Sequence, residues 1–236
     1  ENIRYELEKA FFLAYHGRSG PVVLDIPDNY QREDININSL IGYSPSLKSD
    51  DQNINRSIEK CIELLKHSKR PVLILGWGIH LSGAYKEARE LIKVLGIPFA
   101  PTWAVADILE SGIPLYIGTF GTHGTRYSNF AVQNSDLIIS IGSRLDTKAT
   151  GSPISTFARG AKKIVVDIDN YELKKFKKFG LDVDLLINAD AKYFIRLLKE
   201  KVKNINTPDY KEWIKQIKIW KSKYPICPER YYSEKK

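Results

Sequence analysis

Residues 71–78 read PVLILGWG, a run of five apolar residues that ends in a glycine-bearing turn. Apolar runs of this length predict a strand buried on both faces, as in a parallel sheet. Similar runs recur at 97–101, 136–141, 163–168 and 185–188. Segments with helical spacing of apolar residues alternate with them, at 54–65, 83–95, 126–133, 171–178 and 191–202. This alternation predicts an α/β fold with a doubly wound, Rossmann-like parallel sheet over residues 54–204.

The first part of the chain follows a different pattern. Residues 2–16 have helical spacing, and the segment GRSGP at 17–21 ends that helix. Residues 22–26 are almost wholly apolar, which predicts a short buried strand. From residue 28 to about 53 the chain is rich in Asn, Asp and Ser, a composition typical of a connection. We therefore expect a helix-strand fragment of another α/β domain before the regular sheet.

The end of the chain is strongly basic. Residues 208–223 have the pattern of a basic amphipathic helix, and Pro225 and Pro228 then end regular structure. The whole chain has 36 Lys and Arg against 28 Asp and Glu, a formal net charge of +8. Most of the excess falls on polar positions of expected helices, which favours solvated helix faces. A nucleic-acid binder remains the alternative for this charge.

Composition excludes several classes of protein. An apolar content of 43% in 236 residues is enough for a sizeable core, which argues against a disordered chain. No apolar run approaches the roughly 20 residues of a membrane-spanning helix. Cys61 and Cys227 form neither a metal-binding spacing nor a disulfide framework, so we expect a cytoplasmic location. The absence of methionine leads us to expect a piece of a longer protein.

The carboxyl ends of the expected strands are where a ligand should bind. After the first strand, Gly76, Trp77 and Gly78 would let the backbone approach a diphosphate at a helix N-terminus. Leu81 occupies the position of the third glycine in a dinucleotide fingerprint, so an ordinary tight turn is the alternative.

Later strand ends carry further candidates. Gly142, Ser143 and Arg144 suit a phosphate or an adenine, although Arg144 paired with Asp146 is an equal alternative. Asp167 and Asp169 lie at the end of the strand at 163–168, and Asp190 follows the strand at 185–188. Carboxylates at such positions commonly accept hydrogen bonds from ribose hydroxyls, with helix capping as the alternative.

A second glycine-bearing turn, GTHGT at 121–125, precedes an expected helix. Its glycines imply a tight backbone path beside a ligand, which makes Gly121, Thr122, His123 and Gly124 candidates for ligand contacts. Nothing near His123 in the sequence would orient it as a base, so packing or ligand contact is favoured over catalysis. We find neither a Ser/His/Asp or Cys/His catalytic signature nor a phosphate-binding loop of the GxxxxGK type. We assign no catalytic or metal-binding residue.

Several of these segments together resemble a known family. Residues 20–27 (GPVVLDIP), 70–78, 121–131 (GTHGTRYSNFA), 135–137, 142–151 (GSRLDTKATG) and 165–169 follow in the order found in thiamine-diphosphate-dependent enzymes of the acetolactate synthase family. The resemblance covers roughly residues 1–200. It implies that 1–33 form the C-terminal end of a pyrimidine-binding domain, 34–53 a linker and 54–204 a central domain with a Rossmann-like or DHS-like fold. Residues 205–236 would be the connecting helix and linker toward a diphosphate-binding domain.

The resemblance also implies a function. The complete enzyme would use thiamine diphosphate and magnesium to decarboxylate a 2-keto acid and join the product to an acceptor, as a homo-oligomer. The activating glutamate and the Gly-Asp-Gly metal motif would lie outside this chain, so this piece alone would be inactive. In relatives the central domain holds FAD, holds ADP or is empty. A stand-alone Rossmann-like NAD- or ADP-binding protein is the alternative function.

In this family a nucleotide would contact a defined set of residues. The diphosphate would face Gly76 and Gly78, and Thr102 and Trp103 would lie along a flavin with 121–124. The adenine and ribose would lie near Gly142, Arg144, Asp167, Ile168 and Asp190. This sequence departs from the family at two places in this site. Trp77 occupies the middle of what is usually a run of three glycines, and residues 145–148 read LDTK where the family has a run of the Phe-Asp-Asp-Arg type.

Overall fold

The computed structural model describes residues 2–45, 51–108, 113, 115–228 and 231. The chain divides into two compact units, Glu1–Asp50 and Asp51–Lys236. The division falls inside the predicted linker at 34–53. Each unit is described by itself.

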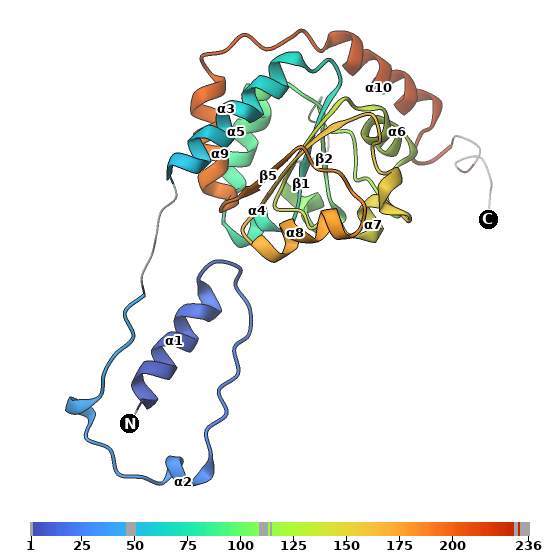
Figure 1. The fold of residues 1–236 in the computed structure, drawn as a ribbon. Coiled ribbons are helices and arrows are strands. Elements are labelled where there is room, and N and C mark those ends of the chain that lie inside the picture. The colour runs from blue at the N-terminus through green and yellow to red at the C-terminus, as the bar shows by residue number, and fades with distance from the viewer. Residues whose placement is uncertain (1, 46–50, 109–112, 114, 229–230, 232–236) are drawn as a thin grey trace. The chain divides into compact units, whose positions relative to one another are not determined.

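The second unit is built on a five-stranded parallel sheet (Figure 1). Its strands are β1 (Pro71–Leu75), β2 (Phe99–Pro101), β3 (Leu137–Ile141), β4 (Lys162–Asp167) and β5 (Leu185–Asn188), in the order β2-β1-β3-β4-β5. The register pairs Leu75 with Ile141, and Ile141 with Val166. The predicted parallel α/β sheet is therefore confirmed, with strand bounds within two residues of those expected.

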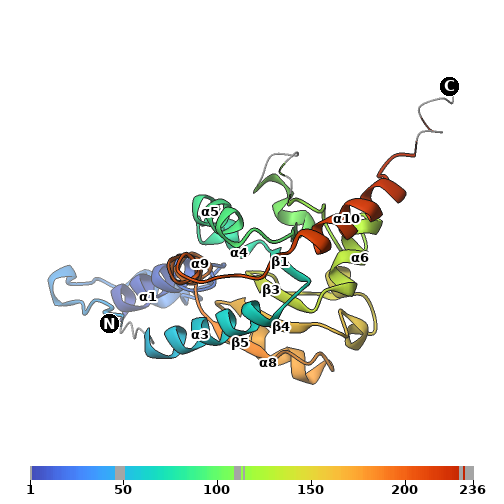
Figure 2. The ribbon, with the colours of Figure 1, turned by 90° about the horizontal axis from the view of Figure 1, so that it is seen from above.

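Helices cover both faces of this sheet, as the doubly wound prediction requires. On one face lie α3 (Asp51–His67), α5 (Tyr85–Leu95) and α9 (Ala191–Val202). On the other lie α6 (Arg126–Asn134), α8 (Asn170–Lys178) and α10 (Lys211–Lys223), and α10 runs beside α6 (Figure 2). Neighbouring residues of one strand alternate between the two cores, because successive side chains of a strand point to opposite faces. Leu73 and Leu75 thus face one core, and Val72 and Ile74 face the other.

Short helical turns complete the unit. They are α4 (Gly78–Leu81), a 3-10 segment at Trp103–Ile108 that kinks at Val105, α7 (Thr147–Thr150) and a 3-10 turn at Ile154–Thr156. Three of them follow the carboxyl end of a strand directly or after a few residues. Apolar periodicity cannot reveal helices of four residues, which is why α4 and α7 were not expected.

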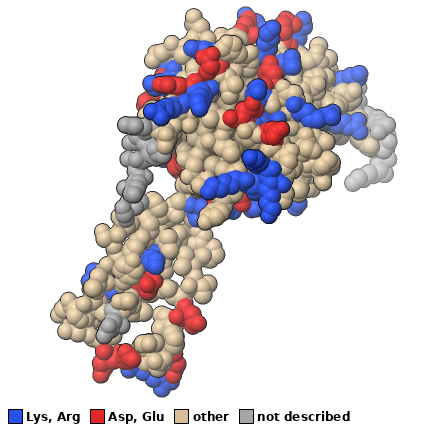
Figure 3. All heavy atoms as spheres, viewed as in Figure 1, with Lys and Arg blue, Asp and Glu red and all other residues tan. Residues whose placement is uncertain are grey.

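Charged side chains of opposite sign lie among one another on the face of this unit drawn in Figure 3. Arg196 Nη2 is 2.8 Å from Glu87 Oε1, and Lys162 Nζ is 2.8 Å from Asp184 Oδ1. This mixture agrees with the solvated helix faces expected from the sequence.

The first unit contains α1 (Ile3–Tyr15), the single turn α2 (Asp28–Gln31) and a 3-10 turn at Ile37–Ser39. The Glu8 carboxylate joins α1 to the returning chain, because it accepts hydrogen bonds from Arg4 Nε (2.8 Å) and from the Tyr43 backbone N–H (2.7 Å). The Tyr43 ring packs edge-on against Tyr5, with centroids 5.3 Å apart.

The strand predicted at 22–26 is wrong: these residues are not assigned to a strand, and Val23 is 88% exposed. A strand exists through hydrogen bonds to a neighbouring strand, and no described strand pairs with this segment. Apolar composition alone could not supply that neighbour.

Candidate functional site

A pocket of about 160 Å³ opens at the carboxyl ends of the central strands. The chain passes from β1 to β2 on one side and reaches β3 on the other, so the point between β1 and β3 is where the strand order reverses. Ligands of open parallel sheets bind at this switch point. Residues that follow β1, β2 and β3 line the pocket, together with parts of the 120–124 turn and α7.

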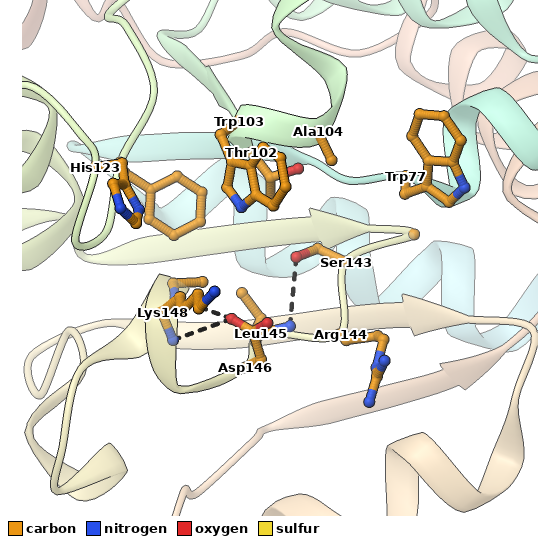
Figure 4. Close-up of a pocket in the computed structure, with 13 residues that line it drawn as sticks. Trp77, Thr102, Trp103, Ala104, His123, Ser143, Arg144, Leu145, Asp146 and Lys148 are labelled. Atoms are coloured by element: carbon orange, nitrogen blue, oxygen red, sulfur yellow. Dashed lines mark hydrogen bonds between the residues drawn. The ribbon is translucent and has the colours of Figure 1, made fainter.

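The labelled side chains in Figure 4 come from four separate segments. His123 lies toward one end of the pocket and Trp77 toward the other, and Trp103 lies between them. Predicted residues that line the pocket are Trp77, Thr102, Trp103, His123, Gly142, Ser143 and Arg144. The glycine-bearing turns at 76–78, 121–124 and 142 therefore converge on one edge of the sheet, as expected for turns that follow the carboxyl ends of parallel strands.

The glycines at the ends of β1 and β3 pack against each other. The Gly78 N–H donates to the Gly142 carbonyl at 2.9 Å, and Gly142 has a φ of +63°. A Cβ added to Gly76 would lie 2.3 Å from the Gly142 oxygen. Close packing of the two turns is thus sufficient to require these glycines. Neither Gly76 nor Gly78 lines the pocket, so their contact with a diphosphate stays a prediction.

The 121–124 turn is fixed to its neighbours by hydrogen bonds. The Gly121 N–H donates to Asn129 Oδ1 at 2.7 Å, and Asn129 Nδ2 donates back to the Gly121 carbonyl at 3.0 Å. The Thr122 N–H and hydroxyl both donate to the Lys148 carbonyl at 2.8 Å, which docks the turn on α7. The Gly124 N–H donates to the Gly121 carbonyl at 3.0 Å. Gly121, Thr122 and Gly124 therefore fix the backbone of the turn, whereas His123 lines the pocket.

Two tryptophans present apolar rings at this pocket. Trp77 is 51% exposed and Trp103 is 65% exposed, although both side chains line the cavity. The Trp77 ring packs against His80 with centroids 4.4 Å apart, and His80 Nε2 is 3.0 Å from Asp107 Oδ1. Because aromatic rings gain from stacking and from burial, exposed tryptophans beside a cavity are suited to a planar ligand.

Arg144 and Lys148 provide positive charge in the pocket. Arg144 Nε is 3.4 Å from Glu172 Oε1 on α8, whereas Asp146 accepts hydrogen bonds at 3.1 Å from the backbone N–H groups of Lys148 and Ala149. The alternative pairing of Arg144 with Asp146 is therefore wrong, because Asp146 caps α7 and Arg144 reaches α8. An arginine held by a single ion pair keeps donors for a further anion.

Asp167, Ile168 and Asp190 lie outside the pocket lining. Asp167 Oδ1 accepts from the Asp169 N–H at 2.9 Å, and Asn188 Nδ2 donates to the Ile168 carbonyl at 2.8 Å. Asp190 caps α9 by accepting from the Tyr193 N–H at 3.0 Å. The capping alternative thus describes Asp190 in this structure, and the ribose contacts of the three residues stay predictions.

Comparison with known proteins shows what this arrangement belongs to. The family model described as "Thiamine pyrophosphate enzyme, central domain" matches residues 58–198. This chain belongs to that family. The match begins within α3, covers all five strands and ends within α9, so the fold and the resemblance expected from the sequence are confirmed.

Acetolactate synthase large subunits are similar to most of this central-domain chain. One from Cyanidium caldarium is 33% identical over 93% of this chain and 38% of its own length. One from Corynebacterium glutamicum is 35% identical over 95% of this chain and 36% of its own length, and a probable one from Methanococcus aeolicus is 34% identical over 92% and 38%. The chain thus spans less than two fifths of the length of these relatives.

Sequence reasoning missed part of the central-domain pocket. The missed lining residues are Ala104, Phe120, Leu145, Asp146, Lys148 and Ala149. Leu145 is buried with a φ of +44°, a conformation that side chains rarely adopt and that often marks functional sites. The segment GSRLDTKATG contains four of the six, so its full length was the available signal.

Within the described residues of this central-domain chain, no group of three or more His, Cys, Asp or Glu side chains is arranged to hold a metal ion. No helix in the same part of the chain is long and apolar enough to cross a membrane.

Proposed function

We propose that this chain supplies the central domain of a thiamine-diphosphate-dependent enzyme of the acetolactate synthase type, which decarboxylates a 2-keto acid and joins the product to an acceptor. The family match and the printed names of the relatives support this proposal. The central domain would contribute structure and a ligand pocket, and it would be inactive alone. The match to this family disfavours a stand-alone NAD- or ADP-binding protein.

Thiamine diphosphate stabilises carbanions in such reactions, and magnesium ties its diphosphate to protein oxygens. The described residues do not fit thiamine diphosphate with magnesium, because no three or more of their His, Cys, Asp or Glu side chains are grouped to hold a metal ion. We therefore assign no step of the reaction to a residue of this chain. The thiamine diphosphate and magnesium sites would be formed by other segments of the enzyme.

The pocket fits part of a nucleotide. A cavity of about 150 Å³ holds one benzene molecule, so 160 Å³ suits one ring system and not a whole dinucleotide. Trp77 and Trp103 offer faces for the ring, while Arg144 and Lys148 offer donors for an anionic group. We propose that the flavin of FAD or the adenine of ADP enters here and that the rest of the nucleotide extends along the strand ends.

A ligand titration of the purified chain tests the nucleotide proposal. At about 100 times its Kd, a ligand that binds only the folded state stabilises it by about 2.7 kcal/mol. We expect FAD or ADP to raise the unfolding temperature and to quench tryptophan fluorescence. Arg144→Ala should weaken nucleotide binding about fivefold. Arg159→Ala, at an exposed position outside the pocket, should leave the affinity unchanged. A response to NAD alone would support the alternative function.

An activity assay tests the enzyme proposal. The purified chain with pyruvate, thiamine diphosphate and magnesium should release no carbon dioxide. The longer polypeptide encoded by the gene that contains this chain should release carbon dioxide and form a carbon–carbon bond. A longer product that neither decarboxylates nor ligates 2-keto acids would overturn the assignment.

Assembly and location belong to the same proposal. We propose that the enzyme is a homo-oligomer in the cytoplasm, supported by the relatives' family and by the absence of a disulfide framework in the sequence. Light scattering of the longer product and fractionation of cells check these two points.

A further inference from the structure

A second groove, of about 230 Å³, lies between α10 and the edge of the sheet. Residues 115–117 run beside β2 and extend this edge: the Phe99 N–H donates to the Leu115 carbonyl at 2.9 Å, and the Ile117 N–H donates to the Phe99 carbonyl at 3.1 Å. No residue that lines this groove also lines the pocket at the strand ends. The groove is therefore a separate feature of the domain.

Apolar side chains form most of the groove lining. The sheet edge contributes Pro98, Leu115 and Ile117, and α10 contributes Ile214 and Ile217. Ile217 is 4% exposed, whereas Ile214 and Leu115 are only partly buried, so the inner wall is closed and the outer wall is accessible. A hydrocarbon body that entered here would remove apolar surface from water on both sides.

Two lysines of α10 complete the groove lining. Lys218 and Lys221 follow Ile214 and Ile217 at steps of three and four residues, which places all four on one face of α10. Lys221 Nζ lies 5.8 Å from the centre of the Tyr127 ring, and Lys218 has no carboxylate partner among the described residues. The groove lining contains no Asp or Glu among those residues. An anionic group would thus meet two lysines without a competing carboxylate.

The Tyr116 hydroxyl, a polar group in the groove lining, is partly buried. Burial, followed by the proximity of Tyr127, raises the pKa of the Tyr116 hydroxyl above its ordinary value. Water is therefore partly excluded at this wall of the groove, whereas Lys218 and Lys221 are exposed to solvent.

We infer that this groove binds a small amphiphilic carboxylate, with an aliphatic or aromatic body against the apolar lining residues and the carboxylate beside Lys218 and Lys221. Because a cavity of about 150 Å³ accommodates benzene, 230 Å³ suits a body of about six to ten non-hydrogen atoms. The inference rests on the groove's shape and charge alone, and it stands whether or not the strand-end pocket binds a nucleotide.

Calorimetry with octanoate on the full chain tests the ligand class. We expect saturable binding with one site per chain, at least tenfold weaker binding of 1-octanol, which lacks the charge, and no detectable binding of octylammonium. Butyrate should also bind at least tenfold more weakly, because each buried methylene contributes about 0.8 kcal/mol. Octanoate that fails to bind, or octanol that binds equally well, would overturn the inference.

Charge reversal and amide shifts test the place of binding. Lys218→Glu combined with Lys221→Glu should weaken octanoate binding at least tenfold. Lys215→Glu on the same helix is the control, because Lys215 is exposed and outside the groove lining. Both lysines of the pair are exposed, so the variant should unfold at the temperature of the parent. Octanoate should shift amide signals of residues 115–117 and 214–221. Unchanged binding by the double variant, or shifts confined to the strand-end pocket, would contradict this site.

Discussion

The backbones of Gly78 and Gly142 touch at the carboxyl ends of β1 and β3, where a Cβ added to Gly78 would lie 2.6 Å from the Gly142 Cα. This contact brings the two turns together beside the strand-end pocket, which Gly142 lines. It also provides a structural reason for a pattern that, in the sequence, resembles a diphosphate-binding loop. Close packing of the turns and binding of a diphosphate lead to different predictions for a substitution of Gly78.

Gly78→Ala should destabilise the second unit by about 1–3 kcal/mol, since the added methyl group forces two backbones apart. The unfolding midpoint in urea measures this change. Gly160→Ala is the matched control, because a Cβ there meets nothing within 4 Å, and its effect should stay within about 0.5 kcal/mol. Equal stability of the two variants would mean that the turns do not need their close contact. If Gly78→Ala instead kept its stability and lost nucleotide binding, the ligand role would be favoured.

Asp190→Ala should cost about 1 kcal/mol of stability, since it removes the cap of α9 at the Tyr193 N–H. Asp190→Ser should recover most of this loss, because a serine hydroxyl also caps helices. Thermal unfolding of the two variants gives the comparison. Were Asp190 a ribose ligand as well, FAD or ADP titration would separate the roles: both variants would then bind the nucleotide more weakly than the parent.

Asp184 should give the protein an acid-sensitive component of stability. Burial works against ionisation, but hydrogen bonds from Lys162 Nζ (2.8 Å) and the Lys163 N–H (2.9 Å) outweigh it and lower the pKa of this carboxyl. A lowered folded-state pKa stabilises the protein above the ordinary value of 3.8. That contribution is lost as the pH falls through the folded-state pKa.

The expected effect of Asp184→Asn is a loss of about 0.5–1 kcal/mol at pH 7, since the Lys162–Asp184 pair is partly exposed. The difference in the free energy of unfolding between the variant and the parent should narrow as the pH drops below 3.8. Urea titrations over pH 2–7 measure this difference. Asp182→Asn, at an exposed neighbour, serves as the control. A gap that is constant across this range would show that the Asp184 charge contributes nothing.

Cys61 should be inert in the folded chain. It is fully buried, and burial raises the pKa of its thiol to about 12, so only about one thiol in ten thousand is ionised at pH 8. Cys227 is only partly buried. A disulfide reagent at pH 8 should therefore react rapidly with one thiol and with the second only on unfolding. Cys227→Ser should abolish the rapid phase, and rapid reaction of that variant would contradict the burial of Cys61.

Apolar runs in the sequence were sufficient to predict the strands of the sheet. β1 matches the predicted bounds, because a buried parallel strand has a continuous apolar run that turns interrupt at both ends. β5 also matches them, although it is an edge strand in which only Ile187 is buried. The same reasoning failed at 22–26, where an apolar run has no described strand beside it. Periodicity reports which side chains avoid water, and a strand additionally needs a partner that the pattern does not contain.

The sequence by itself determined the α/β class, the places where strands end and the tryptophans and cations that follow those ends. Only the tertiary structure decided that β1 lies between β2 and β3, and hence that Trp77, Trp103 and His123 line one pocket. The tertiary structure likewise decided that Arg144 forms an ion pair with Glu172, although Asp146 is nearer in sequence. The physical reason is that apolar spacing acts over a few residues, whereas strand order and ion pairing join segments that the whole sheet must first bring together.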